Sequence, residues 1–485
     1  MTGKIFRVEI LAVLWAAAVM ISMLMVKPII GVADNGDFSR IMGQTGLEYI
    51  SSDRSDRYFG YVNREYKMTH EAAPGRGYFS SEVLLVWLAK LLNCTFTLQK
   101  QIFDIRFLSF IYICTLLLSF YLIIKSAKGD APLLNIAAAA AFIFTFTDIA
   151  YISYFNSFYG EAVSFSFLLL STGWALWLAR QQKYPVAALA AFFTAALFFV
   201  AAKVQYAPVG LLVAFFGIRL MGLRKDKVWR FSIAFFCALM VVASMTSYLS
   251  VPEGIRVCNK YQTVFYGVLK DSPDPRKDLE ELGMDPGLAV LAGTNYFMQQ
   301  YPLDIKDPAF SKEISEKVNP LKIALFYAKH PSRFLRKLQT AAKYGFDIMQ
   351  GFGNYEKAPG IEYGKTAKSL GLWSNLRLKI LPRSLGFVAS FYAVYFAVLL
   401  IRRKKADTTQ LKLFLEILML IGLIGASQFV VPLIGDGEAD LSKHMFLFNV
   451  CFDMMLVVSF TGLLNAAAGW LKRFFQAFPG KAKLC

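Results

Sequence analysis

Long apolar runs alternate with polar connections along the whole chain. Runs long enough to cross about 30 Å of hydrocarbon occur at ten places: residues 8–30, 103–124, 133–148, 161–179, 185–202, 206–222, 230–251, 384–401, 411–433 and 446–470. Because a helix satisfies its backbone hydrogen bonds internally, each run predicts a transmembrane helix. Residues 80–93 are apolar but too short to span, and predict a helix lying in the interface. The pattern therefore predicts an all-α polytopic membrane protein with about ten transmembrane helices, interfacial helices and one large, mainly helical extracytoplasmic loop.

The composition supports this class. Of the 485 residues, 56% are hydrophobic and only 18% are charged, which leaves too few polar side chains to cover a soluble protein. The first run is longer than the apolar part of a signal peptide and no small-residue cleavage site follows it, so it predicts an uncleaved span. The six cysteines are scattered, and no paired spacing among them indicates a disulfide framework or a CxxC metal site. Three histidines make a histidine-based metal centre improbable.

The charge distribution predicts the orientation. With a cytoplasmic N-terminus, the connections on the inner side carry nearly all of the net charge of +18, as the positive-inside rule requires. The basic composition therefore needs no nucleic-acid partner. Both termini are expected in the cytoplasm. The chain then divides into a first helix (1–30), an extracytoplasmic loop with interfacial helices (31–102), helices two to seven (103–251), a large, mainly helical extracytoplasmic domain (252–383), and the last three helices with a cytoplasmic tail (384–485).

Membrane lipids are expected partners. The later half of the large domain interleaves aromatic side chains with many lysines and arginines. This pattern fits a helix resting on anionic headgroups, and equally a solvated charged face.

Polar residues gather in five clusters on the predicted outer side. Four of them lie at span ends: Asp34, Asp37 and Arg40; Asp148, Asn156, Tyr159 and Glu161; Lys203; and Asp436, Glu438, Asp440, Lys443 and His444. A fifth, with His70, Glu71, Arg76 and Glu82, leads into the interfacial helix. Each cluster alone has a structural interpretation, such as a first-turn acid, an aromatic belt or a snorkelling lysine. Their concentration on one face indicates a site, because ionisable groups at the membrane boundary are costly.

Acids and cations together fit one kind of chemistry. Transfer of a sugar from a lipid phosphate to a hydroxyl needs a carboxylate near the acceptor as general base. It also needs cations, or a metal held by acids, to stabilise the departing phosphate. Both groups must lie where lipid headgroups are, which is where this chain concentrates them.

The motifs resemble those of the GT-C superfamily of polytopic glycosyltransferases. "GDFSR" is similar to the Asp-led motif after the first span of that superfamily, whose aspartate is the catalytic base. The match favours Asp37 as base and Asp34 as the second candidate. The family often has a second acid after this aspartate, and here Phe38 stands in that place.

A more specific resemblance runs from Ala33 to about Val450. The segments "ADNGDFSRI", "YFNSFYGE", "NKYQTVFYGVLKDSPDP", "LGMDPGLAVLAGTNYF" and "GDGEADLSKHMFLFNV" are similar to bacterial hexose transferases of surface-layer glycan biosynthesis. This implies a polyprenyl-phosphate hexose donor, a cell-envelope glycan acceptor, and inverting transfer at the outer face of the bacterial cytoplasmic membrane.

On this hypothesis the clusters at the span ends have roles. Lys203, Lys443 and His444 hold the lipid phosphate near Arg40, and Asn156, Tyr159 and Glu161 line the sugar pocket. Asp436 and Asp440 orient Lys443 or bind a divalent cation, Mg²⁺ or Mn²⁺, although no ligand set in the sequence requires a metal or another cofactor.

Two other classes remain open. A lipid-linked sugar transporter or flippase would also place charges near the membrane, but it favours sites at mid-depth and internal repeats. A non-catalytic scaffold of envelope glycan assembly would tolerate loss of Asp37. Asp453, which lies within the last span, fits either a packed polar residue or a functional one.

Overall fold

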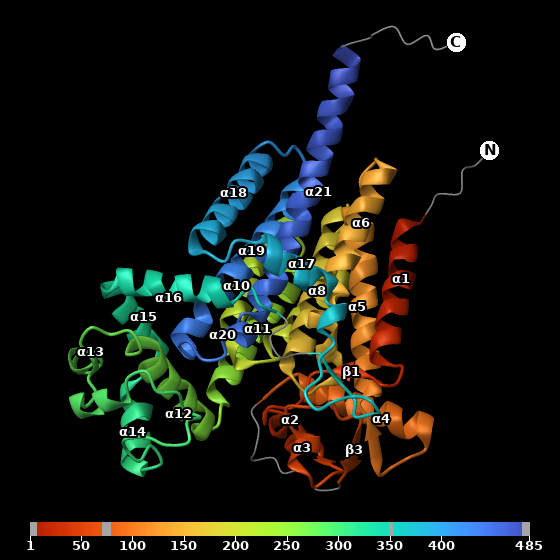
Figure 1. The fold of residues 1–485 in the computed structure, drawn as a ribbon. Helices are drawn as coiled ribbons and strands as arrows, with labels where there is room; N and C mark the ends of the chain where they lie inside the picture. The colour runs from red at the N-terminus through yellow and green to blue at the C-terminus, as the bar shows by residue number, and fades with distance from the viewer. Residues whose placement is uncertain (1–6, 70–78, 349–352, 478–485) are drawn as a thin grey trace.

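The computed structural model describes residues 7–69, 79–348 and 353–477, with side chains up to residue 469. His70, Glu71 and Arg76 of the fifth polar cluster lie outside the described residues. The apolar helices gather into one bundle (Figure 1), and the chain is an all-α polytopic membrane protein apart from two small sheets. The bundle helices are α1 (Val8–Leu24), α5 (Arg106–Ala127), α6 (Pro132–Phe146), α8 (Gly160–Arg180), α9 (Val186–Val200), α10 (Ala207–Leu220), α11 (Lys227–Leu249), α18 (Leu385–Lys404), α19 (Thr409–Gly435) and α21 (Phe446–Ala477).

A bundle helix stands at each of the ten predicted positions, but not all of these helices reach spanning length. Among the described residues, seven helices are long and apolar enough to cross a membrane, and eight if one bent pair counts as a single span. The shorter apolar helices α1 and α9 have 17 and 15 residues, below the roughly 20 that a perpendicular span needs.

The bent pair has a local cause. Helix α6 ends at Phe146, and Asp148 caps the next helix by accepting a hydrogen bond from the Ala150 amide at 3.0 Å. The short α7 (Ile149–Ile152) and the 3₁₀ turn η1 (Ser153–Asn156) therefore run at 50° to α6. A side-chain cap inside an apolar run starts a new helix axis.

Helix α8 is the centre of the bundle. It packs on α5, α9, α19 and α21, and its side chains are buried along nearly its whole length. Small residues allow the close approach: a Cβ on Gly173 would lie 3.0 Å from the Leu122 side chain on α5. Such contacts are typical of helix association in membranes.

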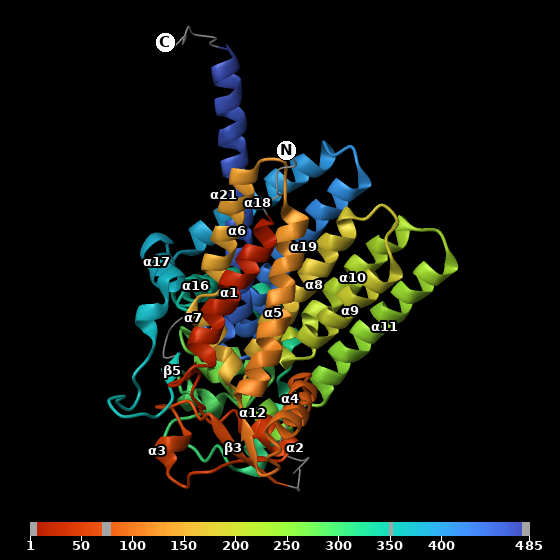
Figure 2. The same cartoon turned by 90° about the vertical axis from the view of Figure 1, so that its right-hand side faces the viewer.

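The first loop folds beneath the bundle at the end opposite to the start of α1 (Figure 2). It holds β1 (Ile30–Gly31), α2 (Ser39–Thr45), β2 (Leu47–Tyr49), α3 (Arg54–Arg57), β3 (Glu65–Met68), α4 (Glu82–Thr97) and β4 (Ile102–Asp104). Strands β2, β3 and β4 form an antiparallel sheet with Tyr66 opposite Tyr49 and Phe103. Helix α4 lies at the position of the predicted interfacial helix.

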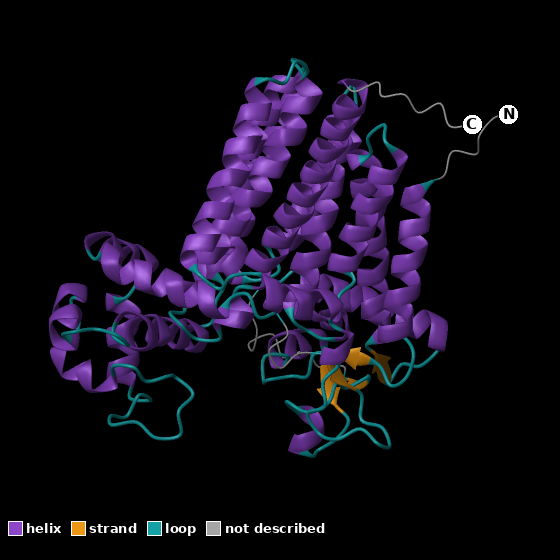
Figure 3. Cartoon of the chain, turned by 45° about the horizontal axis from the view of Figure 1, so that its top comes forward, coloured by secondary structure: helices purple, strands orange, loops and turns teal. Residues whose placement is uncertain are grey.

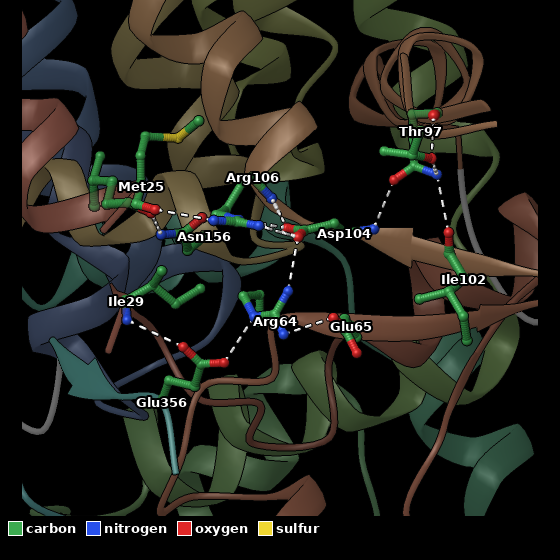
Figure 4. A network of polar contacts seen from close by, with 12 residues as sticks. Met25, Ile29, Arg64, Glu65, Thr97, Ile102, Asp104, Arg106, Asn156 and Glu356 are labelled. Carbon is green, nitrogen blue, oxygen red and sulfur yellow. Dashed lines mark hydrogen bonds and ion pairs between the residues drawn. The ribbon is translucent and has the colours of Figure 1, made fainter. Parts of the chain in front are cut away.

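An ion-pair network fastens this loop to the bundle (Figure 4). Arg64 contacts Asp104 at 2.9 Å and Glu356 at 2.8 Å. Asp104 in turn contacts Arg106 at 2.7 Å, and Arg106 donates to the Met25 carbonyl at the end of α1 at 3.1 Å. The backbone that follows α1 is thereby held in place at Met25. This position matters because the first acidic cluster begins at Asp34, nine residues after Met25.

The large segment after α11 forms a mainly helical body beside the bundle end (Figure 3). It contains α12 (Glu253–Tyr261), the π-helical η4 (Gln262–Val268), α13 (Pro275–Leu282), the 3₁₀ helix η5 (Pro286–Leu291), α14 (Pro308–Lys317), α15 (Pro320–Lys329) and α16 (Pro331–Tyr344). Tyr261, Phe265, Phe310 and Phe326 belong to its own apolar core. The chain then returns through β5 (Asn354–Tyr355), which pairs antiparallel with β1, through η6 (Lys368–Leu370), and through α17 (Leu372–Ile380).

Helix α17 is anchored to the bundle by a buried charge. The fully buried Arg377 lies 3.2 Å from Asp453 of α21 and donates to Asn449 at 2.7 Å. The same Asp453 oxygen accepts from Tyr151 at 2.5 Å and from the Trp373 indole at 2.6 Å. Asp453 therefore has structural partners that the apolar run around it did not reveal.

Candidate functional site

The turn after α1 is built by Asp34. Its Oδ1 accepts hydrogen bonds from the amides of Gly36 at 2.7 Å and Phe38 at 3.0 Å, and its Oδ2 accepts from the Tyr49 hydroxyl at 2.6 Å. Gly36 has a φ of +108°, which only glycine adopts easily. Asp34 is 2% exposed, and burial raises its pKa against the opposing effect of these hydrogen bonds. Both of its oxygens are occupied in holding the turn.

The same turn presents Asp37. Its side chain is 29% exposed, with Oδ2 at 2.7 Å from the Lys443 ammonium and Oδ1 at 2.9 Å from the Arg40 guanidinium. Partial burial acts to raise the pKa of Asp37, but the charges of Lys443, Arg40 and Lys203 outweigh it and hold the pKa well below its usual range. Asp37 is therefore a carboxylate that stays ionised between cations.

Lys443 reaches Asp37 from the other end of the chain. It lies in the short helix α20 (Leu441–His444), between α19 and α21, and its side chain is 10% exposed. Its ammonium lies 4.3 Å from the centroid of the Tyr159 ring, a cation–π contact. The Tyr159 hydroxyl accepts from the Asn35 amide at 3.0 Å. Three segments distant in sequence thus meet at Asp37.

Lys203 forms a second pair, with Glu161. The two charged groups are 2.7 Å apart, and Glu161 is fully buried in the first turn of α8. A Cβ on Gly160 would lie 2.7 Å from the Ala202 carbonyl, so glycine is needed for the hairpin to approach. The helix dipole favours an acid at this position.

His444 forms a third pair, with Asp436. His444 Nε2 lies 2.9 Å from Asp436 Oδ2. Gln205 donates from Nε2 to the His444 carbonyl at 2.7 Å, so its Oε1 is the atom that faces His444 Nδ1 at 3.0 Å. Because Gln205 Oε1 can only accept, Nδ1 is the donor in this contact. Burial raises the pKa of Asp436, against the effect of His444.

The other predicted residues have different surroundings. Asn156 is fully buried and donates to the carbonyls of Leu24 at 2.9 Å and Ile30 at 2.8 Å, which ties η1 to the end of α1. The backbone carbonyl of Asp440 accepts from the Lys443 amide at 2.9 Å and so starts α20. Asp440 has a φ of +41°. Among the described residues, the ammonium of Lys443 contacts the carboxylate of Asp37 and not that of Asp440.

Sequence reasoning missed the residues that hold the loop before α20. Lys337 of α16 and Lys270 each contact Glu438 at 2.7 Å. Gly437 packs on the π-helical η4, where a Cβ on Gly437 would lie 2.8 Å from the Gly267 Cα. The helical body after α11 thus fixes the loop that carries Lys443. Glu438 in "GDGEADLSKH" is visible in the sequence as an acid near a span end. Its partners Lys337 and Lys270 could not be identified, because they lie more than a hundred residues away.

The site offers no evident metal centre. Within residues 7–69, 79–348 and 353–477, no group of three or more His, Cys, Asp or Glu side chains could hold a metal ion. Asp37 already pairs with Lys443, and Asp436 already contacts His444. These pairs do not fit a Mg²⁺ or Mn²⁺ site as they stand, and the divalent cation stays a prediction.

The fold and the site together define a multi-pass membrane protein with paired charges gathered at one end of its bundle. A family model for the YfdI N-terminal transmembrane domain matches residues 2–478. The chain belongs to this family, and the membership is consistent with a membrane glycosyltransferase-like protein. No curated protein matches the sequence.

Proposed function

We propose that the chain is a GT-C-type hexosyltransferase. It moves a hexose from a polyprenyl-phosphate donor to a cell-envelope glycan acceptor at the outer face of the bacterial cytoplasmic membrane. The observation that carries this proposal is the position of Asp37, a partly exposed carboxylate within 2.9 Å of two cations. Family membership and the charge asymmetry of the connections support the membrane class and the orientation.

The ion pairs suggest how Asp37 becomes a base. A carboxylate held between Lys443 and Arg40 binds protons weakly, because their charges lower its pKa. A donor phosphate carries the charge that these cations prefer, since charge-assisted contacts to phosphate are strong. When Lys443 turns to the phosphate, Asp37 loses a counter-charge and its proton affinity rises. Donor binding thus prepares the base.

The reaction then follows from the positions of the groups. The acceptor hydroxyl oxygen attacks C1 of the hexose while its proton passes to Asp37. The bond between C1 and the phosphate oxygen breaks, and polyprenyl phosphate leaves with the negative charge, which Lys443 and Arg40 stabilise. A single displacement at C1 inverts its configuration. Lys203 adds positive charge at the same end of the bundle beside Glu161, and the His444 ring lies there beside Asp436.

Transfer of labelled hexose tests the proposal directly. Membranes that contain the wild-type chain are supplied with polyprenyl-phosphate hexoses, and label is followed into envelope glycan. Membranes with the Glu48→Gln variant serve as a matched control, because Glu48 is an exposed acid of the same loop. We expect equal transfer by the two chains for at least one hexose. Absence of transfer across the plausible hexoses would remove this function and favour a lipid-linked sugar transporter.

Removal of the Lys443 charge should weaken donor binding. In Lys443→Gln we expect the KM for the donor to rise about 10- to 100-fold, the usual value of a charge-assisted contact. The acid limb of the pH profile of kcat/KM should also move to higher pH, because Asp37 loses the cation that lowers its pKa. Lys443→Arg keeps the charge and should retain most of the affinity. An unchanged donor KM in Lys443→Gln would place the phosphate elsewhere.

A further inference from the structure

A cavity of about 420 Å³ opens beside the turn that presents Asp37. Asn35 and Gly36 form one side of it, and the other side is lined by Ser52, Arg54, Arg57, Tyr58 and Phe59. The two sides are joined by the backbone, since the Phe59 amide donates to the Asp34 carbonyl at 2.9 Å. Because Gly36 directly precedes Asp37, a molecule that fills the cavity lies next to the candidate base.

The charges of the cavity are positive and unpaired. Arg54 and Arg57 line it, and neither forms an ion pair with an acid of the described residues. By contrast, Arg64 of the same loop contacts three carboxylates. Arg57 is also held in place, with Nε donating to the Ser51 carbonyl at 2.6 Å. Unpaired guanidinium groups in a concave site favour an anionic ligand.

The rim of the cavity carries an exposed aromatic side chain. Phe59 is 57% exposed and has a φ of +65°, a conformation that bulky residues rarely adopt and that clusters at functional sites. Its neighbour Tyr58 is fixed by a hydrogen bond from the Tyr363 hydroxyl to its carbonyl at 3.0 Å. Aromatic faces pack well against the C–H faces of sugar rings, so Phe59 is suited to a glycan rather than to a free ion.

We propose that this cavity binds the acceptor glycan through an anionic group, either a phosphate or a carboxylate. Arg54 and Arg57 contact the anion and Phe59 packs on a sugar ring, which brings an acceptor hydroxyl to Asp37. The donor phosphate occupies a different place, beside Lys443. The inference rests on the proposed function in calling the ligand an acceptor, but binding can be measured without transfer.

The test measures binding to the detergent-solubilised full chain by titration calorimetry. Three probes are compared: a trisaccharide that ends in phosphate, the same trisaccharide ending in a uronate, and the neutral parent. We expect an anionic probe to bind the wild type about 10-fold more tightly than the neutral one. Preference for the phosphate probe, for the uronate probe or for both identifies the source of the anion.

Variants assign the preference to the two arginines. The double variant Arg54→Gln/Arg57→Gln should lose the roughly 10-fold preference and bind the neutral probe as before. The matched control Lys67→Gln, which removes an exposed cation of the same loop outside the cavity, should keep it. Arg54→Lys/Arg57→Lys should retain part of it. Should the glutamine variant fail to fold, raising NaCl from about 50 to about 500 mM must weaken only the anionic probes of the wild type.

Three results overturn the inference: equal affinity for charged and neutral probes, a preference that survives the glutamine variant, or displacement of the bound trisaccharide by polyprenyl phosphate. The last result would assign the cavity to the donor. None of these depends on transfer, so failure of this inference and failure of the proposed function are distinct outcomes.

Discussion

The Asp37→Asn variant should lose hexose transfer by about 10²- to 10⁴-fold in kcat, the usual contribution of a general base. Asparagine keeps the shape of the side chain and cannot accept the proton of the acceptor hydroxyl. The KM for the donor should stay the same or fall, because the side chain that competes with the donor phosphate for Lys443 has lost its charge. A scaffold or an unrelated structural role predicts no such loss of kcat with an unchanged or lower KM.

Two control variants separate the loss of the base from other effects of removing an acid in this loop. Asp34→Asn should cost much less, because an amide oxygen can still accept the hydrogen bonds from Gly36 and Phe38 that hold the turn. Glu48→Gln, on the exposed face of the same loop, should transfer like the wild type. Transfer should be compared in membranes that contain the wild type and each variant at matched protein levels, after insertion of each variant into the membrane has been verified. Transfer by Asp37→Asn within tenfold of the wild type would remove Asp37 from the mechanism.

The second large effect concerns stability. Asp453→Asn should lower the free energy of unfolding by about 3–5 kcal/mol, because it leaves the Arg377 charge buried without a counter-charge. Both side chains are fully buried, and a single Asp453 oxygen holds Arg377, Tyr151 and Trp373. The loss in the free energy of unfolding can be measured by unfolding the detergent-solubilised chain with increasing SDS while its tryptophan fluorescence is monitored.

The pair itself should be replaceable. Asp453→Leu/Arg377→Met removes both charges together and should recover much of the lost stability, as apolar replacement of buried pairs often does. Glu316→Gln, in an exposed pair with Lys312, should change nothing measurable. A stable Asp453→Asn chain that fails in transfer would instead assign Asp453 to the function.

The spans could be predicted from the sequence because apolar length is a local property. The chain places a helix at all ten apolar runs, although α1 and α9, with 17 and 15 residues, are shorter than the runs that predicted them. The strands of the first loop could not be predicted, since β2, β3 and β4 have only three or four residues and little alternation. Their pairing depends on Tyr66 packing between two partner strands.

The candidate site was predictable as a set of residues but not as a set of contacts. Charge at span ends identifies Asp37, Lys203 and Lys443, because such charges are costly anywhere near a membrane. It does not separate Asp34, whose role follows from a hydrogen bond to Tyr49, fifteen residues away. It also gives no sign that the Asn156 amide donates to backbone carbonyls at the end of α1 rather than facing a sugar. These differences arise from tertiary contacts.

The contact between Lys443 and Asp37 joins residues 406 positions apart. A ribosome that adds about 5–20 residues per second needs roughly 20–80 s to pass from one to the other. Throughout that interval the growing chain already displays its acidic turn, yet the cation that completes it has not been made. A chain that ends before α20 therefore lacks this ion pair, which can form only after most of the protein has been made.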